Sequence, residues 1–389
     1  MRKKKVCIVT GSRAEWGLLS PIAGALAVRG DVELQIIATN MHLLERYGHT
    51  VDEIRRDGFR VDAEVAMESR SDSRADTAAA TGSCLSGMAR AFERLDPDLA
   101  VVLGDRYELL AVCSAATIMR IPIVHLHGGE ISEGAIDDSI RHAVTKLSAL
   151  HLTSAEVHRR RVVQMGENPD MVHNIGAVGV ANALAVEPLA KSELESFLGV
   201  GIDRRTLVVT YHPVTADDRS SGELFGSLLA ALERFVTSTV VFTYPNNDAH
   251  GQEIIRMIDR FVASHPERAV AFPSLGMKRY LSLLRYAGAA VGNSSSGIIE
   301  VPSMGIPTVN IGRRQEGRLS ASSVIDCADD EASIADAVAR ALSDCCQKAA
   351  ATADNPYFKP DTVSRAAELI ATTPIEKLRH KRFHDVNIF

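Results

Sequence analysis

One short segment of the chain, HLHGGEISEGAIDDSIRH at residues 125–142, contains three histidines, four carboxylic acids and three glycines. Histidine and carboxylate side chains are the usual general acids and bases of enzymes, because their pKa values lie at neutral pH or can be moved toward it. Glycine lets a chain turn sharply away from a strand. The segment therefore predicts proton-transfer chemistry close to a strand end.

A further acid stands at a comparable position. The strand-like run LAVVLGD ends in Asp105, and the next such run, IPIVHLH, ends in His127. Carboxyl ends of parallel strands meet at one edge of a sheet, where open α/β folds bind their ligands. The side chains expected to converge at this edge are Asp105, His127, Glu130 and Asp137. Asp105 could instead cap the helix that follows it.

Asp137 and Asp138 stand where a helix should begin. One of them is expected to be the N-cap and the other to face the ligand. Arg141 lies one turn along the same helix, where it can pair with either acid and hold it ionised.

The first strand-like run is followed by GSRAEWG at residues 11–17. This is neither a GxGxxG fingerprint nor a P-loop, so it gives no support to an NAD-binding or ATP-binding fold. Arg13 at a strand-to-helix junction could aim a fixed charge at a ligand. Alternatively, Arg13 is solvated and Glu15 is an ordinary helix-start acid.

The second half of the chain carries different strand-end residues. The stretch VGNSSSGIIEVPSMG at residues 291–305 indicates a strand, then serines and a glycine, then a helix. Amides and hydroxyls at such a helix start can bind an anion, although serine and glycine also form an ordinary cap. Glu300, one turn inside, could accept hydrogen bonds from ribose hydroxyls. The residues of this candidate site are Ser294, Ser295, Ser296, Gly297 and Glu300.

Other polar residues of this half also follow strand-like runs: His212, Asn246, Arg313, Arg314 and Arg318. Arginines beside a helix-start anion site fit a diphosphate, because guanidinium groups form paired, charge-assisted hydrogen bonds with phosphate. Acidic residues in one half of the chain and residues that could bind a diphosphate in the other half suggest an enzyme that acts on a nucleotide sugar.

Apolar, β-branched runs alternate with helix-period segments along the chain, and the pattern starts again after residues 176–188. Such alternation predicts parallel sheets with helices on both faces. We expect one domain over residues 1–180 plus about 360–389 and a second over 181–359, with ligands in a cleft between them. The helix-like segment 363–370 is expected to cross back onto the first domain.

Composition excludes several classes of protein. The chain has 389 residues, 46% of them hydrophobic, which is enough for two cores. A net charge of -6 provides no basic field for nucleic acid, and no apolar run is long enough to cross a membrane. Six cysteines without CxxC spacing fit a reducing cytoplasm rather than a disulfide framework or a metal site.

Seven motifs, in this order along nearly the whole chain, resemble the hydrolysing UDP-N-acetylglucosamine 2-epimerases: TGSRAE, GDRYE, HLHGGE, IDDSIRH, YHP, NSSSG and GRRQ. The resemblance is closest to the branch that supplies N-acetylmannosamine for sialic-acid and other nonulosonic-acid sugars. It implies two Rossmann-like doubly wound domains facing a cleft, the GT-B architecture. It also implies no cofactor and no metal, and homodimers are common in the family.

The resemblance implies a reaction in which UDP leaves C1 as the C2 proton is removed, giving a glycal. Water then adds at C1, and C2 is reprotonated on the opposite face. By motif, Asp105 and Asp137 match the acid/base carboxylates and His212 a histidine near the leaving diphosphate. The matched nucleotide-binding positions are Arg13 and Ser294 to Gly297 for phosphate, Glu300 for ribose and Arg314 for the nucleotide end.

The chain departs from the family pattern at one position. Many relatives read H-x-E-G-G, whereas this chain has His127 at the third place and Glu130 three residues later. Either His127 takes over proton transfer, which its near-neutral pKa permits, or Glu130 supplies the carboxylate.

Three other functions compete with UDP-N-acetylglucosamine epimerisation. The same reaction could act on a UDP-2,4-diacetamido-2,4,6-trideoxyhexose (N,N'-diacetylbacillosamine), as in relatives that feed legionaminic-type sugars. A GT-B glycosyltransferase would share the diphosphate site and use an acceptor other than water. A non-catalytic nucleotide-sugar sensor would bind the sugar without releasing UDP.

Overall fold

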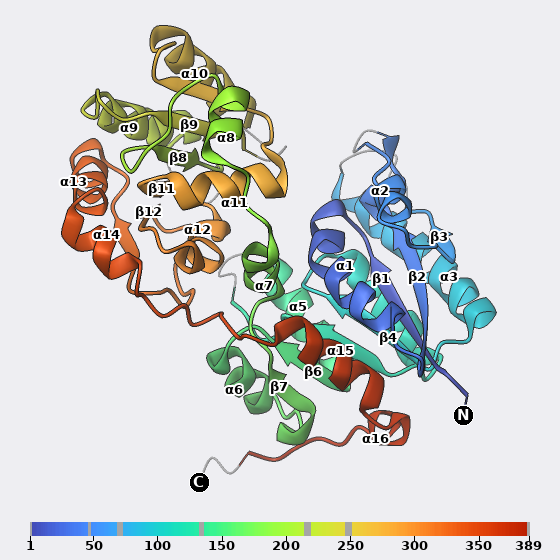
Figure 1. The fold of residues 1–389 in the computed structure, drawn as a ribbon. Helices are drawn as coiled ribbons and strands as arrows, with labels where there is room; N and C mark the ends of the chain where they lie inside the picture. The colour runs from blue at the N-terminus through green and yellow to red at the C-terminus, as the bar shows by residue number, and fades with distance from the viewer. Residues whose placement is uncertain are drawn as a thin grey trace. The chain divides into compact units, whose positions relative to one another are not determined.

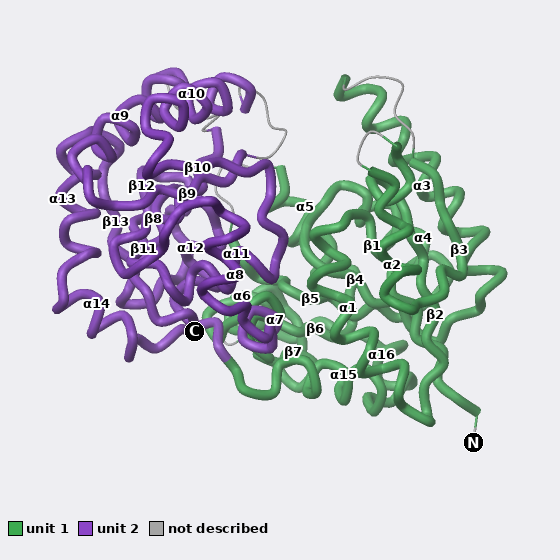
Figure 2. Tube along the Cα trace, turned by 45° about the horizontal axis from the view of Figure 1, so that its top comes forward, with its two compact units in different colours: residues 1–181, 359–389 green, residues 182–358 purple. Residues whose placement is uncertain are grey.

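The computed structural model describes residues 2–45, 48–67, 73–131, 136–213, 219–245 and 251–386. The chain divides into two compact units, which Figure 2 shows in different colours. Unit 1 comprises Met1–Ala181 with Lys359–Phe389, and unit 2 comprises Asn182–Phe358.

Unit 1 is built around a parallel sheet of seven strands in the order β3-β2-β1-β4-β5-β6-β7 (Figure 1). Its strands are β1 Lys4–Thr10, β2 Val32–Thr39, β3 Ala63–Val65, β4 Leu99–Leu103, β5 Ile123–Leu126, β6 Leu150–Thr153 and β7 Val172–Asn174. Neither β3 nor β6 was predicted from the sequence. β3 has only three residues, and the β6 sequence LHLT carries a histidine in the middle of its apolar run.

Successive residues of the buried strands point to opposite faces of the sheet. Val6 and Ile8 of β1 belong to one apolar cluster, and Cys7 and Val9 belong to another. A strand buried on both faces needs such a continuous apolar run.

The helices of unit 1 cover both faces. They are α1 Arg13–Ala27, α2 Val51–Arg56, α3 Arg74–Leu95, α4 Glu108–Ile118, α5 Ile136–Leu147, α6 Glu156–Gln164, α15 Thr362–Thr372 and α16 Ile375–Arg379, with short 3₁₀ helices η1 Asn40–Leu43 and η3 Pro169–Met171. Residues of α1 and α15 fill the first apolar cluster, and residues of α3, α4 and α5 fill the second. The segment 363–370 lies within α15, which packs against α1.

Unit 2 repeats the arrangement with six parallel strands in the order β10-β9-β8-β11-β12-β13. They are β8 Leu207–Thr210, β9 Val240–Thr243, β10 Ala269–Phe272, β11 Ala289–Gly292, β12 Thr308–Ile311 and β13 Val324–Cys327. In both units the order of the first six strands is that of a doubly wound α/β sheet, in which the first strand lies in the middle.

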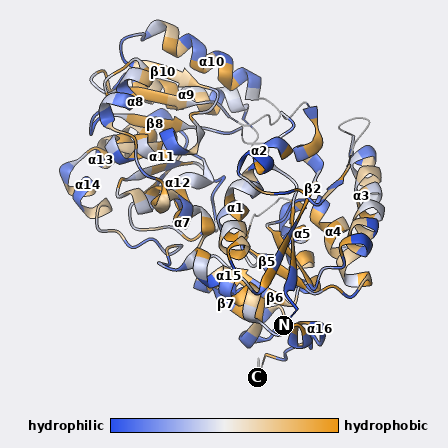
Figure 3. Cartoon of the chain, turned by 45° about the vertical axis from the view of Figure 1, so that its right-hand side comes forward, coloured by the Kyte–Doolittle hydropathy of each residue, from blue (hydrophilic) through white to orange (hydrophobic). Residues whose placement is uncertain are grey.

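The helices assigned to unit 2 again lie on both faces of its sheet. They are α8 Lys191–Leu198, α9 Ser221–Glu233, α10 Gly251–Ser264, α11 Gly276–Tyr286, α12 Ser295–Ile299, α13 Glu331–Ala341 and α14 Asp344–Ala350, with the 3₁₀ helix η4 Val301–Met304. Helix α7, Val178–Ala185, connects the two units along the chain. Figure 3 shows the strands mostly in the colour of hydrophobic residues and α10 with both colours along its length. Within the described ranges, every helix is too short or too polar to cross a bilayer.

Candidate active site

The candidate acid/base residues of unit 1 lie at the carboxyl ends of β4 and β5. Gly104 follows β4 with a φ of 86°, and its N–H donates to Leu126 O at 3.0 Å. Asp105 comes next. His127 follows β5, and its N–H donates to Leu152 O at 2.9 Å. The two side chains therefore leave neighbouring strands at the same edge, as the strand-end argument expects.

Arg141 connects this edge to α5. Its guanidinium group donates to Asp105 Oδ2, to Asp138 Oδ1 at 3.2 Å and to Glu130 O at 2.9 Å. The Arg141 side chain is only 3% exposed, so its charge is little screened by water. Asp105 is thus held by an arginine, and the position that caps α4 belongs to Tyr107. This excludes the alternative in which Asp105 caps that helix.

Asp137 lies in the first turn of α5 beside this network. Burial raises the pKa of the Asp137 carboxyl, and the negative charge of Asp105 raises it further, while the Arg141 and Arg106 guanidinium groups oppose the shift. A carboxyl with a raised pKa can carry a proton closer to neutral pH, as an acid/base group requires. The expectation that Asp137 or Asp138 is the N-cap was wrong, because α5 already includes Ile136 and both acids lie inside the helix.

His127 and Glu130 belong to one network. Nδ1 of His127 lies 3.4 Å from Glu130 Oε1, and Val178 N–H donates to Nε2 of the same ring at 3.5 Å. With Nε2 accepting, the ring hydrogen of the neutral form is on Nδ1, toward the carboxylate. His127 has a φ of 65°, a conformation that costs a non-glycine residue about 1–3 kcal/mol and occurs often at functional sites.

Glu130 also accepts a hydrogen bond from Ser154, the residue that directly follows β6. Ser154 Oγ donates to Glu130 Oε1 at 2.6 Å and lies 2.9 Å from His158 Nδ1. Neither Ser154 nor His158 was identified from the sequence. Their signal was a serine immediately after an apolar run, with a histidine one helical turn later.

Three further residues at this edge were also missed in their present role: Glu15, Arg106 and Glu108. Glu15 and Glu108 are 6% and 0% exposed. Gly11 N–H donates to Glu15 Oε2 at 2.6 Å, and Arg106 Nε donates to Glu108 Oε1 at 2.8 Å. Burial, together with the Glu108 charge, raises the pKa of Glu15 to about 8. The interpretation of Glu15 as an ordinary helix-start acid is therefore insufficient.

His125 in β5 and Asn40 after β2 are two further buried polar residues near these strand ends. His125 Nε2 lies 2.8 Å from Gly104 O and Nδ1 lies 3.2 Å from Thr145 Oγ1. Burial lowers the pKa of His125 to about 3, so the ring is neutral and ties the Gly104 turn to α5. Asn40 has a φ of 48°, and its buried Nδ2 has no hydrogen-bond acceptor among the described residues.

Arg13 is the first residue of α1, after the cap Ser12. Its Nε lies 3.0 Å from Glu53 Oε2, and its side chain is 66% exposed. The structure thus gives Arg13 an acidic partner on α2 and leaves most of the side chain in solvent.

In unit 2, the strand-end residue His212 is held by its backbone. His212 N–H donates to Asn293 Oδ1 at 2.7 Å, and Asn293 Nδ2 donates to His212 O at 2.8 Å. Asn293 is fully buried at the end of β11. Its own carbonyl accepts from Arg314 NH1 at 3.2 Å and from Gln315 Nε2 at 2.8 Å. One asparagine therefore joins the segments that carry His212 and Arg314.

The serine-rich turn begins α12. Ser294 is the N-cap residue, and its side chain makes no capping hydrogen bond. Tyr280 OH lies 3.4 Å from Ser296 Oγ. Gly297 packs against β12: an added Cβ would lie 2.8 Å from Thr308 Cγ2, so only glycine fits without displacement. Glu300 follows α12 and donates its N–H to Ser296 O. Asn246 lies outside the described residues.

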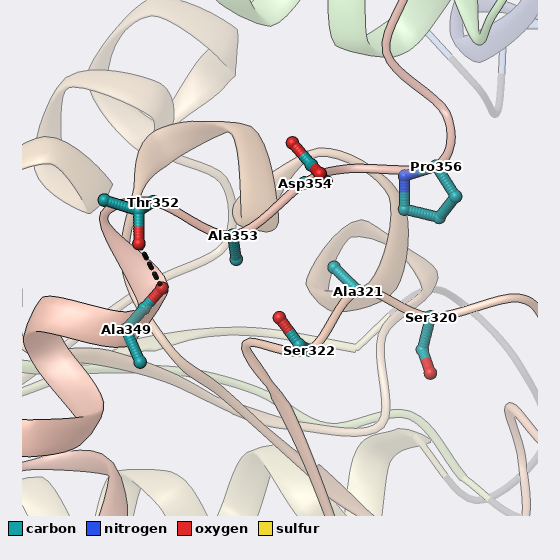
Figure 4. A pocket seen from close by; sticks show the side chains of 8 residues that line it. All are labelled: Ser320, Ala321, Ser322, Ala349, Thr352, Ala353, Asp354 and Pro356. Carbon is teal, nitrogen blue, oxygen red and sulfur yellow. Dashed lines mark hydrogen bonds between the residues drawn. The ribbon is translucent and has the colours of Figure 1, made fainter.

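Two cavities occur among the described parts of unit 2. One, of about 310 Å³, is lined by residues of α12, of β12, of β13 and of the loop between these two strands: Ile298, Asn310, Gly312, Arg313, Gln315, Glu316, Gly317, Arg318, Ser320 and Asp326. The other, of about 480 Å³, lies beside the segment before β13 (Figure 4). Asp354 is the one titratable residue among those that line it, so it offers little chemistry. Within the described ranges, no group of three His, Cys, Asp or Glu residues could hold a metal ion.

Several curated proteins resemble this chain over most of its length. A GDP/UDP-N,N'-diacetylbacillosamine 2-epimerase (hydrolyzing) of Campylobacter jejuni is 39% identical over 84% of this chain and 85% of its own. A UDP-N,N'-diacetylbacillosamine 2-epimerase (hydrolyzing) of Legionella pneumophila is 32% identical over 96% and 97%. A UDP-N-acetylglucosamine 2-epimerase of Neisseria meningitidis is 30% identical over 99% and 100%.

The fold also occurs in solved structures. A Neisseria meningitidis UDP-GlcNAc 2-epimerase bound to UDP-GlcNAc superposes with a TM-score of 0.76 at 16% identity, covering 95% of this chain and 100% of that one. Two parallel, doubly wound units, together with this match, place the chain in the α/β GT-B fold class, as the sequence predicted.

The family follows from the sequence comparison. The family described as UDP-N-acetylglucosamine 2-epimerase matches residues 24–371, and the chain belongs to it. Together with the relatives above, this makes it an enzyme of the hydrolysing type that acts on nucleotide sugars. The family prediction is confirmed.

Proposed function

We propose that this chain converts UDP-N,N'-diacetylbacillosamine and water into UDP and the free 2-epimeric 2,4-diacetamido-2,4,6-trideoxy sugar. The observation that carries the proposal is the network at one sheet edge, in which Arg141 holds Asp105 while Asp137 lies beside it with a raised pKa. Two carboxyl groups in unlike environments can perform opposite proton transfers.

The reaction balances with the groups present. One base takes the C2 proton as the C1–O bond to UDP breaks, which leaves a C1=C2 double bond. A water oxygen then bonds to C1, and a proton returns to C2 from the opposite face. We assign the two proton transfers at C2 to Asp105 and Asp137, with the His127–Glu130 pair as the group that activates water.

The nucleotide end is assigned to unit 2, apart from Arg13, which belongs to unit 1. Phosphate binding is proposed for Arg13 and for the turn from Ser294 to Gly297, with His212 near the leaving diphosphate. Glu300 is proposed to contact ribose, and Arg314 is proposed to bind the nucleotide. The clamp through Asn293 supports this assignment, because it fixes His212 and the Arg314 segment to the same strand end.

The choice of sugar reverses the order given by the sequence, which put UDP-N-acetylglucosamine first. The 39% and 32% identical relatives carry N,N'-diacetylbacillosamine in their names, and the relative named for UDP-N-acetylglucosamine is 30% identical. These names support the diacetamido sugar as substrate.

One experiment tests the reaction type. The protein is incubated in D2O with UDP-N,N'-diacetylbacillosamine, and the released sugar is examined for deuterium at C2 and inverted configuration. Both are expected, together with one UDP per sugar. Transfer of the sugar to an acceptor without exchange at C2 would instead indicate a glycosyltransferase, and tight binding without UDP release would indicate a sensor.

A second experiment tests the sugar. kcat/KM is measured with the UDP-diacetamido sugar, its GDP counterpart and UDP-N-acetylglucosamine. We expect the UDP-diacetamido sugar to be preferred over UDP-N-acetylglucosamine by about tenfold or more, because a site built for a second acetamido group leaves polar groups unpaired without it. Equal values, or a preference for UDP-N-acetylglucosamine, would contradict the proposed substrate.

A further inference from the structure

Two buried carboxyl groups from different helices meet beside Arg106. Glu15 is the third residue of α1 and Glu108 the first residue of α4. Arg106 Nε lies 2.8 Å from Glu108 Oε1 and 3.8 Å from Glu15 Oε1. Both carboxyl groups also reach Gly11: its N–H donates to Glu15, and a Cβ added there would overlap Glu108 Oε1.

The charges around this pair do not balance if both acids are ionised. Arg106 is the cation in contact with them, and its NH2 group lies 3.3 Å from the sulfur of Met41. Asp105 also acts on Glu15, and Glu108 acts on the thiol of Cys84; neither of these groups is positive. Two carboxylates with one guanidinium group would leave an uncompensated charge in a buried place.

The two carboxyl groups also lack hydrogen-bond donors. Oε1 of Glu15 and Oε2 of Glu108 are buried, and neither has a hydrogen-bond donor among the described residues. Buried polar atoms are nearly always paired. A single proton between the two carboxyl groups would supply the missing donor and make the cluster neutral.

We propose that Glu15 and Glu108 share one proton, carried on Glu15, and that this pair makes Arg106 a positioning residue for the carboxylates at the strand ends. Glu108 keeps its negative charge and holds the Arg106 guanidinium group, while neutral Glu15 donates to Glu108 and accepts from Gly11. The role of Arg106 in catalysis rests on the proposed function; the location of the proton does not.

The electrostatics agree with this geometry. Burial raises the pKa of Glu15 to about 8, and the charge of Glu108 adds to the shift. Arg106 in turn lowers the pKa of Asp137, against the effects of burial and of Asp105. An Arg106 that lost its anchor would therefore leave the Asp137 pKa higher.

The location of the proton is tested with the full-length variants Glu15→Gln and Glu108→Gln. Glutamine imitates a protonated acid, so E15Q keeps the donor and the acceptor, whereas E108Q removes the anion that holds Arg106. We expect E108Q to lower Tm far more than E15Q. Infrared difference spectra should show a protonated-carboxyl band in the wild type that is missing in E15Q. Equal losses of Tm, or a band unchanged in E15Q, would overturn the proposal.

The pH dependence gives an independent measurement. A raised pKa on Glu15 contributes stability that is present below its unfolded value of 4.5 and lost as pH rises through about 8. The wild type should therefore lose stability between pH 5 and pH 8 relative to E15Q. Parallel curves for the two proteins would mean that Glu15 carries no proton in this range.

The positioning role is tested by kinetics. We expect E108Q to lower kcat by about tenfold with a smaller change in KM. We also expect it to move the acid limb of the kcat profile to higher pH, because an Arg106 guanidinium group that Glu108 no longer holds opposes the raised pKa of Asp137 less. Glu156→Gln is the matched control, since Glu156 is also the first residue of a helix but is 49% exposed. An acid limb that stays in place would refute the role of Arg106.

The two parts can fail separately. If the wild type turns over neither UDP-sugar, the proposed function fails, while Tm, the infrared band and the pH dependence still decide whether Glu15 holds the proton.

Discussion

The two sheets share one strand order, but the polar side chains at their carboxyl edges differ in kind. At the carboxyl edge of unit 1, arginine, carboxylate and histidine side chains bond to one another, as in the contacts of Arg141 with Asp105 and Asp138. At the carboxyl edge of unit 2, Asn293 holds neighbouring backbone segments through its amide. The first edge is suited to moving protons, and the second to fixing the position of a charged group.

Backbone strain also differs between the two units, and unit 1 carries more of it. Among the described residues, those with positive φ that are not glycine all belong to unit 1: Asn40, His49, Asp96, Arg120 and His127. In unit 2 the described residues with positive φ are glycines, such as Gly292 and Gly312. Two of the strained residues, Asn40 and His127, directly follow strands of unit 1. Two of these five strained residues thus lie at the carboxyl edge of the unit 1 sheet, whereas Asp96 and Arg120 lie at the ends of helices.

The largest expected effect is on the proton-transfer edge. Asp105→Asn and Asp137→Asn should each lower kcat by about 10²–10⁴, because a positioned acid or base contributes that much, with little change in UDP affinity. Steady-state kinetics and UDP titration measure this. Asp361→Asn, at an exposed position before α15 where it makes no capping bond, is the control. A loss of UDP affinity equal to the loss of rate would show that both edges bind the nucleotide.

On the unit 2 edge, the expected effect is on binding. Arg314→Ala should weaken UDP affinity by about 1.5–3 kcal/mol, the usual worth of a hydrogen bond to a charged group, and change kcat less. Arg313→Ala is the matched control, since its side chain is 87% exposed and pairs with Glu316. Calorimetry with UDP distinguishes them. Equal losses in both variants would mean that only net charge matters.

The difference between the edges also explains what the sequence could predict. Apolar runs that alternate with helix-period segments predicted the doubly wound fold, because a strand buried on both faces of a sheet needs a continuous apolar sequence. Strand ends can be read from such runs, so the sequence placed Asp105 and His127 at one edge. It also predicted that Arg141 pairs with Asp137 or Asp138, which the Asp138 contact confirms. It could not predict the bond from Arg141 to Asp105, because Asp105 is 36 residues away and such pairing depends on side-chain direction.

The burial of certain polar side chains also could not be predicted from the sequence. Glu15 was interpreted as an ordinary helix-start acid and Glu108 was not singled out, since local sequence does not show that the Gly11 turn brings both together. The same holds for Asn293, which stands between a strand and a serine-rich turn and was not recognised as a clamp. Long-range contacts of this kind are set by tertiary packing, which overrides local propensity.

A pair of glycine variants compares the edge of unit 1 with its surface. Gly11→Ala should lower the free energy of unfolding by about 1–3 kcal/mol, because its Cβ would overlap Glu108 in a packed site. Gly24→Ala in α1 meets nothing within 4 Å and should raise it by about 0.5–1 kcal/mol, since alanine favours a helix. Urea unfolding measures both. Similar effects would mean that Glu108 moves aside freely.

An effect that is absent at neutral pH concerns acid stability, where a buried neutral histidine adds a pH slope that its replacement removes. His42 is fully buried between Thr10 Oγ1 at 3.0 Å and Thr50 Oγ1 at 2.9 Å, and burial lowers its pKa to about 4. A lowered pKa contributes stability above the unfolded value near 6.5 and loses it as pH falls toward 4. The wild type should lose about 1.4 kcal/mol per pH unit from this residue below pH 6.5, and His42→Gln should lack this slope. Amide exchange in β1, compared with β8 of unit 2 as internal reference, measures it; an unchanged slope in the variant would show that His42 is protonated in the folded state.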